Sequence, residues 1–229
     1  MTRGDFLKKI ASEILGEKYA QRIWKRVEFI GDIALIRTPI GLDPVELQPL
    51  ANELLRRFTY VKSVWAAIPG VSGEYRLREY VWLAGERRSE TIYREHGCLF
   101  KVDFTKVYIS PSLNYEHIRV ARLASPGEII INMFAGAGLF SIIIAKHSKP
   151  SRIYSIDINP YAYSFMKENI RLNNVEDIVI PILGDSKNVI EENLKNTANR
   201  VLMPYPELAL EYLPYALSAL KNRHGWLYK

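Results

Sequence analysis

Two glycines and two aspartates stand at spacings that can hold a nucleoside. Gly136 and Gly138 follow an apolar run at residues 128–133, and glycine lets the backbone turn sharply and approach a ligand closely. Asp157 ends the next apolar run, where a carboxylate can accept both hydroxyl groups of a ribose. Asp185 follows a third run, in a position to meet the edge of an adenine. Together these residues predict one adenosyl-binding crevice.

Two further interpretations compete with this one. Each aspartate alone fits a helix N-cap equally well, because its side chain accepts hydrogen bonds from the free amides of a helix start. The combined set of glycines and aspartates favours a ligand site over two separate caps. A dinucleotide site is disfavoured because the third glycine of that fingerprint is absent, and Phe140 and Ser141 occupy its region.

A parallel sheet would bring these residues together. From about residue 114, predicted strands and helices alternate, which gives a parallel sheet with helices on both faces. The predicted strands are 128–133, 152–158, 178–183, 200–203 and 226–228, and the predicted helices are 115–124, 139–146, 162–173, 189–195 and 206–220. The fold class is therefore α/β with a Rossmann-like domain, in which ligands bind at the carboxyl ends of the strands.

The first part of the chain lacks this alternation. The pattern predicts a helical lead-in at 5–24, one strand at 27–36 interrupted by a turn or bulge at Gly31-Asp32, and a helix that Asp43 caps and that runs to about residue 57. Four short strands follow at 61–67, 76–84, 90–95 and 98–103. We therefore expect a smaller, mixed α+β substrate-recognition or RNA-recognition domain at residues 1–110 and the Rossmann-like domain at 111–229.

Composition narrows the class of protein. The 229 residues carry a net charge of +6 and a pI of about 9.3, which favours polyanionic partners such as nucleic acid. Cys98 is the single cysteine, so no intramolecular disulfide can form, which fits a cytoplasmic location, and no zinc-ligand spacing occurs. We expect no signal peptide and no membrane span, because the most apolar stretch, 140–145, is far too short to cross a bilayer.

Several segments carry a resemblance to a known family. They are Asn132-Met133-Phe134-Ala135-Gly136-Ala137-Gly138, Ile156-Asp157-Ile158-Asn159-Pro160-Tyr161-Ala162, Lys167-Glu168-Asn169-Ile170-Arg171-Leu172-Asn173, Gly73-Glu74-Tyr75-Arg76, Leu83-Ala84-Gly85-Glu86, His96-Gly97-Cys98 and Val107-Tyr108-Ile109-Ser110-Pro111. From about residue 30 to 225 the chain resembles the archaeal and eukaryotic tRNA (guanine-37 N1)-methyltransferases, which are related to the aminocarboxypropyl transferases of wybutosine synthesis. The resemblance implies a class I methyltransferase domain, S-adenosylmethionine as cofactor and tRNA as partner, in a monomer that binds no metal.

The same resemblance implies roles for single residues. Glu116 matches the carboxylate that takes the N1 proton, and Arg76 matches the arginine that hydrogen-bonds guanine O6. A positioned carboxylate can act as general base, and a guanidinium can stabilise the negative charge that gathers on O6. Without the resemblance, Glu116 also fits a surface residue of a first helical turn and Arg76 a solvated strand face.

The remaining implied site residues fall into two groups. The cofactor-binding residues are Tyr108, Phe134, Ala135, Gly136, Gly138, Asp157, Ile158 and Asp185, and the substrate-binding residues are Pro204, Tyr205 and Pro206. Tyr108 also fits a core residue, which is the commoner role of a tyrosine in a strand-rich region.

The chain departs from the family pattern at four points. Asn132 stands where the family commonly has Asp, and Ser112 where it has Arg. Pro204 replaces the Asn of the loop beside the target base, which removes a side-chain amide and a backbone donor. The sequence ends at Lys229, so we expect the family's final helix and antiparallel strands to be missing.

The predicted function is S-adenosylmethionine-dependent methylation of N1 of guanine 37 in tRNA. One alternative is aminocarboxypropyl transfer in wybutosine synthesis, although relatives of that class tend to carry Glu at the position of Asp157. The chain could also be a non-catalytic paralogue that binds tRNA or the cofactor, or a small-molecule methyltransferase.

Overall fold

The computed structural model describes residues 6–71, 73, 75, 77–221 and 226–228. The chain divides into two compact units and passes from one to the other more than once. The first unit comprises residues 1–93 and 103–111, and the second comprises 94–102 and 112–229. Each unit has its own hydrophobic core.

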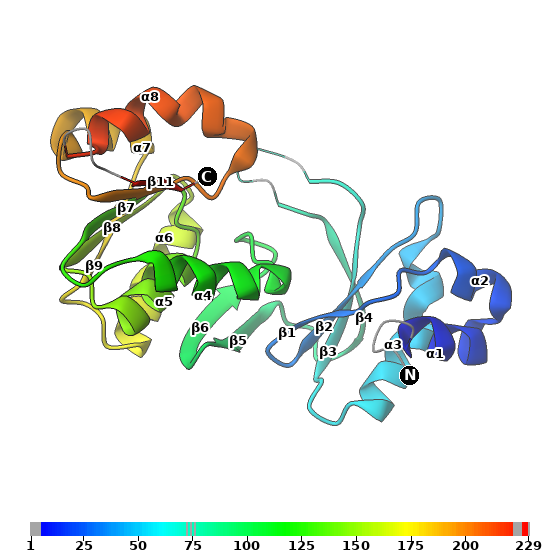
Figure 1. Ribbon diagram of the computed structural model, residues 1–229. Helices are drawn as coiled ribbons and strands as arrows, with labels where there is room; N and C mark the ends of the chain where they lie inside the picture. The colour runs from blue at the N-terminus through cyan, green and yellow to red at the C-terminus, as the bar shows by residue number, and fades with distance from the viewer. Residues whose placement is uncertain (1–5, 72, 74, 76, 222–225, 229) are drawn as a thin grey trace. The chain divides into compact units, whose positions relative to one another are not determined.

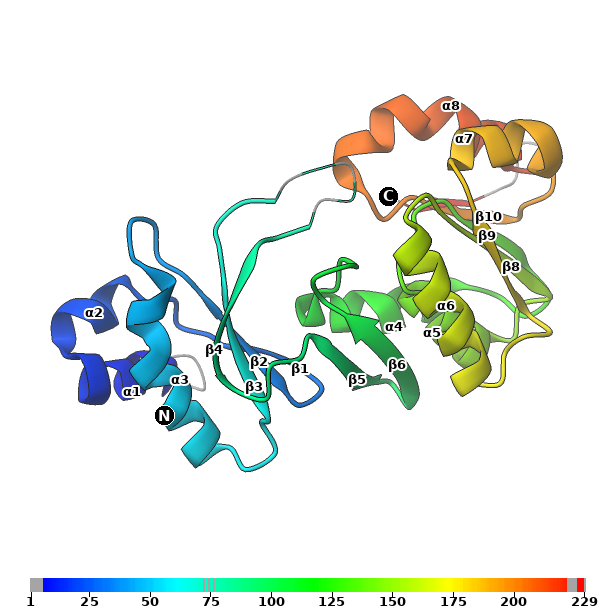
Figure 2. The ribbon, with the colours of Figure 1, turned by 180° about the vertical axis from the view of Figure 1, so that it is seen from behind.

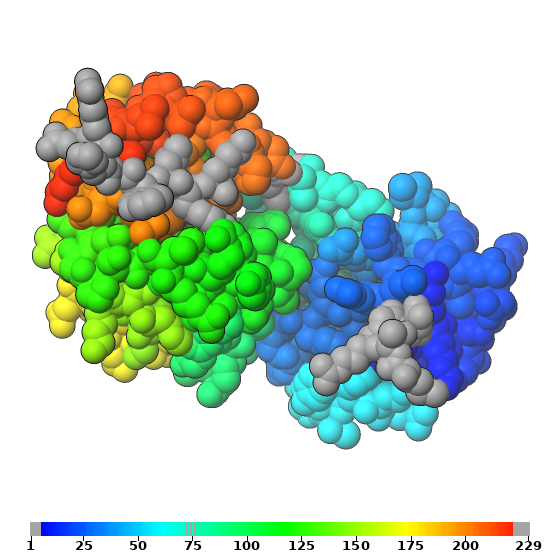
Figure 3. Space-filling model, viewed as in Figure 1, coloured from blue at the N-terminus to red at the C-terminus, as the bar shows by residue number. Residues whose placement is uncertain are grey.

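The N-terminal unit is a four-stranded sheet with helices packed on one face (Figures 1 and 2). Its helices are α1 (Phe6–Leu15), α2 (Glu17–Arg22), the 3₁₀ turn η1 (Pro44–Leu47) and α3 (Gln48–Arg57), and its strands are β1 (Glu28–Ile30), β2 (Ile33–Arg37), β3 (Ser63–Ala67) and β4 (Tyr80–Gly85). Strands β1/β2 and β3/β4 pair antiparallel, whereas β2/β3 pair parallel. Helices α1 and α2 pack against each other, and their blue atoms lie side by side in the space-filling view (Figure 3).

Two local predictions for this unit differ from the structure. The helical lead-in is two helices, because Gly16 adopts a positive φ of 90° that ends α1. The single strand expected at 27–36 is a hairpin, with Gly31-Asp32 forming the turn between β1 and β2. The cap at Asp43 is confirmed, since its side chain accepts a hydrogen bond from the Val45 amide at 3.0 Å.

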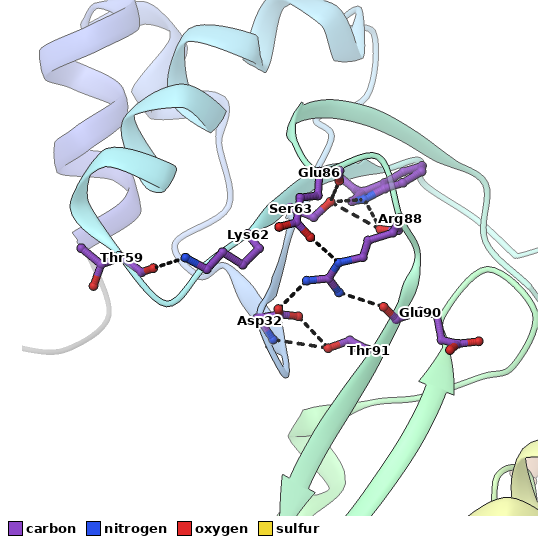
Figure 4. A network of polar contacts seen from close by, with 9 residues as sticks. Asp32, Thr59, Lys62, Ser63, Glu86, Arg88, Glu90 and Thr91 are labelled. Atoms are coloured by element: carbon purple, nitrogen blue, oxygen red, sulfur yellow. Dashed lines mark hydrogen bonds and ion pairs between the residues drawn. The ribbon is translucent and has the colours of Figure 1, made fainter.

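A polar network holds the chain that leaves β4 against the β1–β2 turn (Figure 4). The Arg88 guanidinium pairs with Asp32 and Glu86 and donates to the Glu90 carbonyl at 2.9 Å. The Thr91 hydroxyl donates to Asp32 Oδ1 at 2.7 Å. Since one arginine joins the turn to the segment after β4, this network fixes the path of the chain within the unit.

Gly85, at the end of β4, should tolerate no side chain. A Cβ there would lie 2.2 Å from the Lys62 carbonyl oxygen, and its φ is +80°. We expect Gly85→Ala to lower the free energy of unfolding by about 2–4 kcal/mol, measured by urea denaturation. Gly70 is the matched control, because its φ is +97° but a Cβ would meet nothing within 4 Å. Equal losses in the two variants would contradict the clash with Lys62.

The strands β5 (Glu90–Glu95) and β6 (Cys98–Asp103) form a two-stranded sheet. The turn between them is His96-Gly97, and both residues have positive φ. The unit boundary falls inside this hairpin, because residues 94–102 group with the C-terminal unit and residues 90–93 with the N-terminal unit.

The rest of the C-terminal unit is a five-stranded parallel sheet in the order β11-β10-β7-β8-β9. The strands are β7 (Ile129–Asn132), β8 (Arg152–Asp157), β9 (Val179–Leu183), β10 (Arg200–Leu202) and β11 (Trp226–Tyr228). The helical elements are η2 (Pro111–Leu113), α4 (Asn114–Leu123), α5 (Leu139–Ser148), α6 (Pro160–Leu172), α7 (Ser186–Val189), the π-helical turn η3 (Ile190–Leu194), η4 (Pro206–Leu208) and α8 (Ala209–Ala219).

Helices cover both faces of this sheet, which confirms the predicted Rossmann-like fold. Helices α4, α5 and α6 lie on one side, and α7 and α8 lie on the other (Figures 1 and 2). Apolar residues from α8, η3 and the central strands form the core on the second side. Within the described residues, none of the helices combines the length and the apolar character needed to cross a bilayer.

Candidate cofactor and active site

The glycine turn after β7 has the shape that the sequence predicted. Gly136 and Gly138 have φ values of 55° and 92°, which are left-handed conformations that glycine adopts most readily. The Gly138 amide donates to the Ala135 carbonyl at 2.9 Å, and α5 begins at the next residue. A Cβ built on Gly136 would meet no atom within 4 Å, so the turn is open at this point.

Asp157, the last residue of β8, holds this turn through its carboxylate. Its Oδ2 accepts the Gly136 amide at 2.6 Å and its Oδ1 accepts the Asn159 amide at 2.9 Å. Burial raises the pKa of Asp157, and the two backbone hydrogen bonds offset only part of that rise. An ionised carboxylate has about four lone-pair sites, so each oxygen can still accept a hydrogen bond from a ribose hydroxyl.

Asp185 lies two residues beyond β9 and is the N-cap of α7. Its Oδ1 accepts the Lys187 amide at 2.9 Å and the Tyr212 hydroxyl at 3.2 Å. The cap interpretation that the sequence left open is therefore realised. A contact between Asp185 and an adenine remains a prediction.

The sheet order brings the glycine turn, Asp157 and Asp185 to one edge. Strands β7, β8 and β9 are parallel neighbours, with Asn132 opposite Ser155 and Asp157 opposite Leu183. All three segments follow the carboxyl ends of these strands. The order of the sheet reverses between β7 and β10, and ligands of open α/β sheets bind at such a switch point.

The loop after β10 and helix α8 each contact Phe134, beside the glycine turn, through an aromatic ring. The Phe134 ring lies 5.3 Å from that of Tyr205 and 5.0 Å from that of Tyr212, both in edge-to-face geometry. Pro204 and Tyr205 are partly buried, and Pro206 is exposed. The structure thus joins a predicted cofactor residue, Phe134, to the predicted substrate loop.

Glu116 lies in the first turn of α4 and is paired with Arg119. The guanidinium donates from Nε and Nη2 to the two carboxylate oxygens, each at 2.7 Å. These hydrogen bonds hold the pKa of Glu116 below its ordinary value. The carboxylate is therefore ionised at neutral pH, which is the form that can accept a proton.

If Glu116 is the general base that the family resemblance implies, removing Arg119 should shift the pH dependence of methyl transfer. In Arg119→Gln the pKa of Glu116 rises toward that of an ordinary glutamate, so the acidic limb of the rate profile should move to higher pH. Turnover near neutral pH should change little, because Glu116 stays ionised there. The measurement is the single-turnover rate across pH, with Arg122→Gln on the exposed side of the same helix as control. An unmoved acidic limb would show that Glu116 does not set it.

The other predicted site residues are Arg76, Tyr108, Ile158 and Ala135. Arg76 lies outside the described residues. Tyr108 belongs to the N-terminal unit and is 58% exposed. Ile158 is exposed beside Asp157, whereas Ala135 is buried and its amide donates to the Ile156 carbonyl at 2.9 Å.

Two asparagines at the end of α6 support the site in a way that the sequence did not reveal. The Asn169 side chain accepts a hydrogen bond from the Lys101 amide and donates one to the Lys101 carbonyl. It also donates to the Ala137 carbonyl of the glycine turn at 3.0 Å. Asn173 pairs in the same way with the backbone of Leu99. The four-residue spacing places both side chains on one helix face, where they bond the main chain of β6.

Two buried polar clusters also escape prediction from the sequence. His117 Nδ1 lies 2.6 Å from Glu95 Oε1, and both side chains are almost fully buried. Asn132 donates to Ser141 at 3.1 Å, and Ser155 donates to Ser141 at 2.6 Å. Because the partners come from different elements, only the tertiary fold reveals them.

Two known protein-family models match this chain. Residues 91–228 match the TRM5/TYW2 methyltransferase domain, and residues 7–88 match the TYW2 N-terminal domain.

The chain belongs to the TRM5/TYW2 methyltransferase family.

This assignment confirms the resemblance found in the motifs, and it makes S-adenosylmethionine the cofactor. TRM5/TYW2 relatives differ in reaction. The chain is 50% identical over 202 residues to the "tRNA 4-demethylwyosine(37)-methyltransferase Taw21" of Saccharolobus solfataricus, and the match covers 88% of this chain and 76% of the relative. It is 41% identical over 199 residues to a "tRNA (guanine(37)-N(1))-methyltransferase Trm5b" of Pyrococcus abyssi, with coverage of 85% and 56%. The family therefore establishes a transferase but leaves the reaction open.

Solved TRM5/TYW2 structures share the fold. A complex of aTrm5 with tRNALeu has a TM-score of 0.82 and 33% identity, and the match covers 96% of this chain and 63% of that one. TYW2 of Methanocaldococcus jannaschii in complex with AdoMet has a TM-score of 0.64 and 31% identity, covering 86% and 72%. The chain thus spans less than two thirds of the Trm5b and aTrm5 chains.

The residues at this end of the parallel sheet suit an adenosyl cofactor. The open face of Gly136 admits a ligand close to the backbone, and Asp157 and Asp185 are acceptors suited to the hydroxyl and amine donors of an adenosyl group. Across the ranges that the structure describes, no group of three or more histidine, cysteine or acidic side chains could hold a metal ion.

Proposed function

We propose that this chain transfers the methyl group of S-adenosylmethionine to the base at position 37 of tRNA, and that the acceptor is 4-demethylwyosine. The observation that carries the proposal is the 50% identity to Taw21, a methyltransferase named for that base. A bound tRNA in the aTrm5 structure supports tRNA as the partner.

Pro204 supports the same acceptor on chemical grounds. In guanine-N1 methyltransferases an Asn stands here, whose amide can hydrogen-bond a base edge, and proline offers neither a side-chain amide nor a backbone N–H. In 4-demethylwyosine a third ring joins N1 and N2 of the original guanine. That edge of 4-demethylwyosine therefore offers fewer hydrogen-bonding groups than the same edge of unmodified guanine.

The predicted site residues then have distinct tasks. Gly136, Asp157 and Asp185 would hold the cofactor, which supplies an activated methyl group when bound. The atom of 4-demethylwyosine that accepts the methyl group loses a proton in the reaction, and Glu116 would take that proton. The pair with Arg119 lowers the pKa of Glu116 and orients its carboxylate for this step. Arg76 would stabilise negative charge that develops on the base oxygen.

Methylation of N1 of guanine 37, the function predicted from the sequence, is the second candidate. The 41% identity to Trm5b favours it, and the general-base role of Glu116 applies equally to an N1 proton. Aminocarboxypropyl transfer, named for a relative at 36% identity, is disfavoured by Asp157 in place of Glu.

The three reactions can be separated in one experiment. Purified protein is incubated with S-adenosylmethionine and with tRNA that carries either guanine or 4-demethylwyosine at position 37, and the nucleosides are analysed by mass spectrometry. We expect one added methyl group on 4-demethylwyosine and little on guanine. Methylation of guanine alone would favour the second candidate, addition of an aminocarboxypropyl group would reject methyl transfer, and no product on either tRNA would reject both acceptors.

A further inference from the structure

Tyr212 on α8 is a buried tyrosine whose hydroxyl points at a predicted cofactor residue. Its side chain is 8% exposed, and the hydroxyl donates to Asp185 Oδ1 at 3.2 Å. Burial raises the pKa of Tyr212, so the phenol stays protonated and remains a donor. No motif of the sequence singles out this residue, because it is 27 positions from its partner.

The hydrogen bonds around Asp185 use its two oxygens unequally. Oδ1 receives the Lys187 amide at 2.9 Å and the Tyr212 hydroxyl, which matches the two lone pairs of a carboxylate oxygen. Within the part of the chain that the structure describes, no hydrogen bond to Oδ2 is found. Oδ2 is therefore the oxygen that can accept a donor from a ligand.

The Tyr212 ring is itself held in place. It packs edge-to-face against Phe134 of the glycine turn, with the ring centroids 5.0 Å apart. The Lys187 ammonium lies 4.4 Å from the ring centroid, and Lys187 is paired with Glu211. Because the Tyr212 ring is held on two sides, its hydroxyl oxygen has a fixed position. From that position the hydroxyl can orient the Asp185 carboxylate.

We propose that Tyr212 is a positioning residue that fixes the Asp185 carboxylate so that Oδ2 accepts the exocyclic amine of the cofactor's adenine. The inference rests on the adenosyl cofactor and on the predicted adenine contact of Asp185, but not on the identity of the tRNA acceptor. Tyr212 also packs on Phe134, which contacts Tyr205 in the loop after β10. The same aromatic cluster therefore connects Tyr212 with a predicted cofactor residue and with the predicted substrate loop.

The test measures binding of two cofactor analogues by isothermal titration calorimetry, without tRNA. S-adenosylhomocysteine carries the exocyclic amine, whereas S-inosylhomocysteine has a carbonyl oxygen in its place. For Tyr212→Phe, which keeps the ring and removes the hydroxyl, we expect about a 3- to 10-fold weaker Kd for S-adenosylhomocysteine, the effect of losing one hydrogen bond. The Kd of S-inosylhomocysteine should not change.

Two controls separate positioning from a general loss of structure. Tyr215→Phe removes a hydroxyl from another ring of the same helix, at 6.3 Å from the Tyr212 ring, and should alter neither Kd. In an Asp185→Asn background, Tyr212→Phe should add no further loss for S-adenosylhomocysteine. Equal losses for both analogues, an unchanged Kd for S-adenosylhomocysteine, or additive losses in the double variant would overturn the proposal. Failure of tRNA methylation alone would leave it intact.

Discussion

Replacing Glu116 by glutamine is expected to lower single-turnover methylation of tRNA by about 10²–10⁴-fold, the usual contribution of a general base. The amide has nearly the same shape as the carboxylate but cannot take a proton. The Kd of S-adenosylhomocysteine should stay the same, because Glu116 lies on α4 and not among the residues that follow the carboxyl ends of β7, β8 and β9.

The matched control is Glu192→Gln, an exposed glutamate of η3 in the same unit, which should leave the rate unchanged. A loss of cofactor affinity equal to the loss of rate would place Glu116 in binding and not in proton transfer. An unchanged rate in Glu116→Gln would remove this residue from the mechanism.

A leucine at Gly136 is expected to weaken cofactor binding by about 10- to 100-fold, corresponding to the 1–3 kcal/mol that overfilling a packed site costs. The protein should still fold, because a Cβ at this position would meet no protein atom within 4 Å. The side chain would therefore extend into the space that we assign to the cofactor. Calorimetric titration with S-adenosylhomocysteine measures the effect.

Gly127→Leu controls for the strain of a side chain at positive φ. Gly127 has a φ of +80° and is also free of atoms within 4 Å of a built Cβ, but it lies in the turn before β7, at the opposite end of that strand. Both variants should lose a similar amount of stability, about 1–2 kcal/mol. If both also lost the same affinity, Gly136 would not line the cofactor site.

Local patterns in the sequence predict most of the fold. The alternation of strands and helices after residue 114 identifies the parallel sheet, because hydrophobic periodicity and turn residues agree there. The cap at Asp43 is predictable because Pro44 follows it and the donor amide is two residues away. The region 27–36 resembles one strand because its apolar residues continue across Gly31-Asp32, and only the strand pairing shows that the chain reverses there.

The candidate site is predictable where its residues follow strand ends, and not where they meet through the fold. The sequence predicts that Gly136 and Asp157 share a ligand, but the direct hydrogen bond between them depends on the register of β7 and β8. The Glu95–His117 pair joins residues 22 positions apart, and Asn169 bonds a strand 68 positions earlier. No spacing rule links such partners, so only the folded chain brings them together.

A crystal structure of this protein with S-adenosylhomocysteine would show whether one crevice holds the cofactor. We predict ligand density against the backbone of Gly136, with the ribose hydroxyls within hydrogen-bond distance of Asp157 and the adenine amine within hydrogen-bond distance of Asp185. Density at another surface, or an adenosyl group that contacts neither aspartate, would contradict the cofactor site assigned to this edge of the sheet.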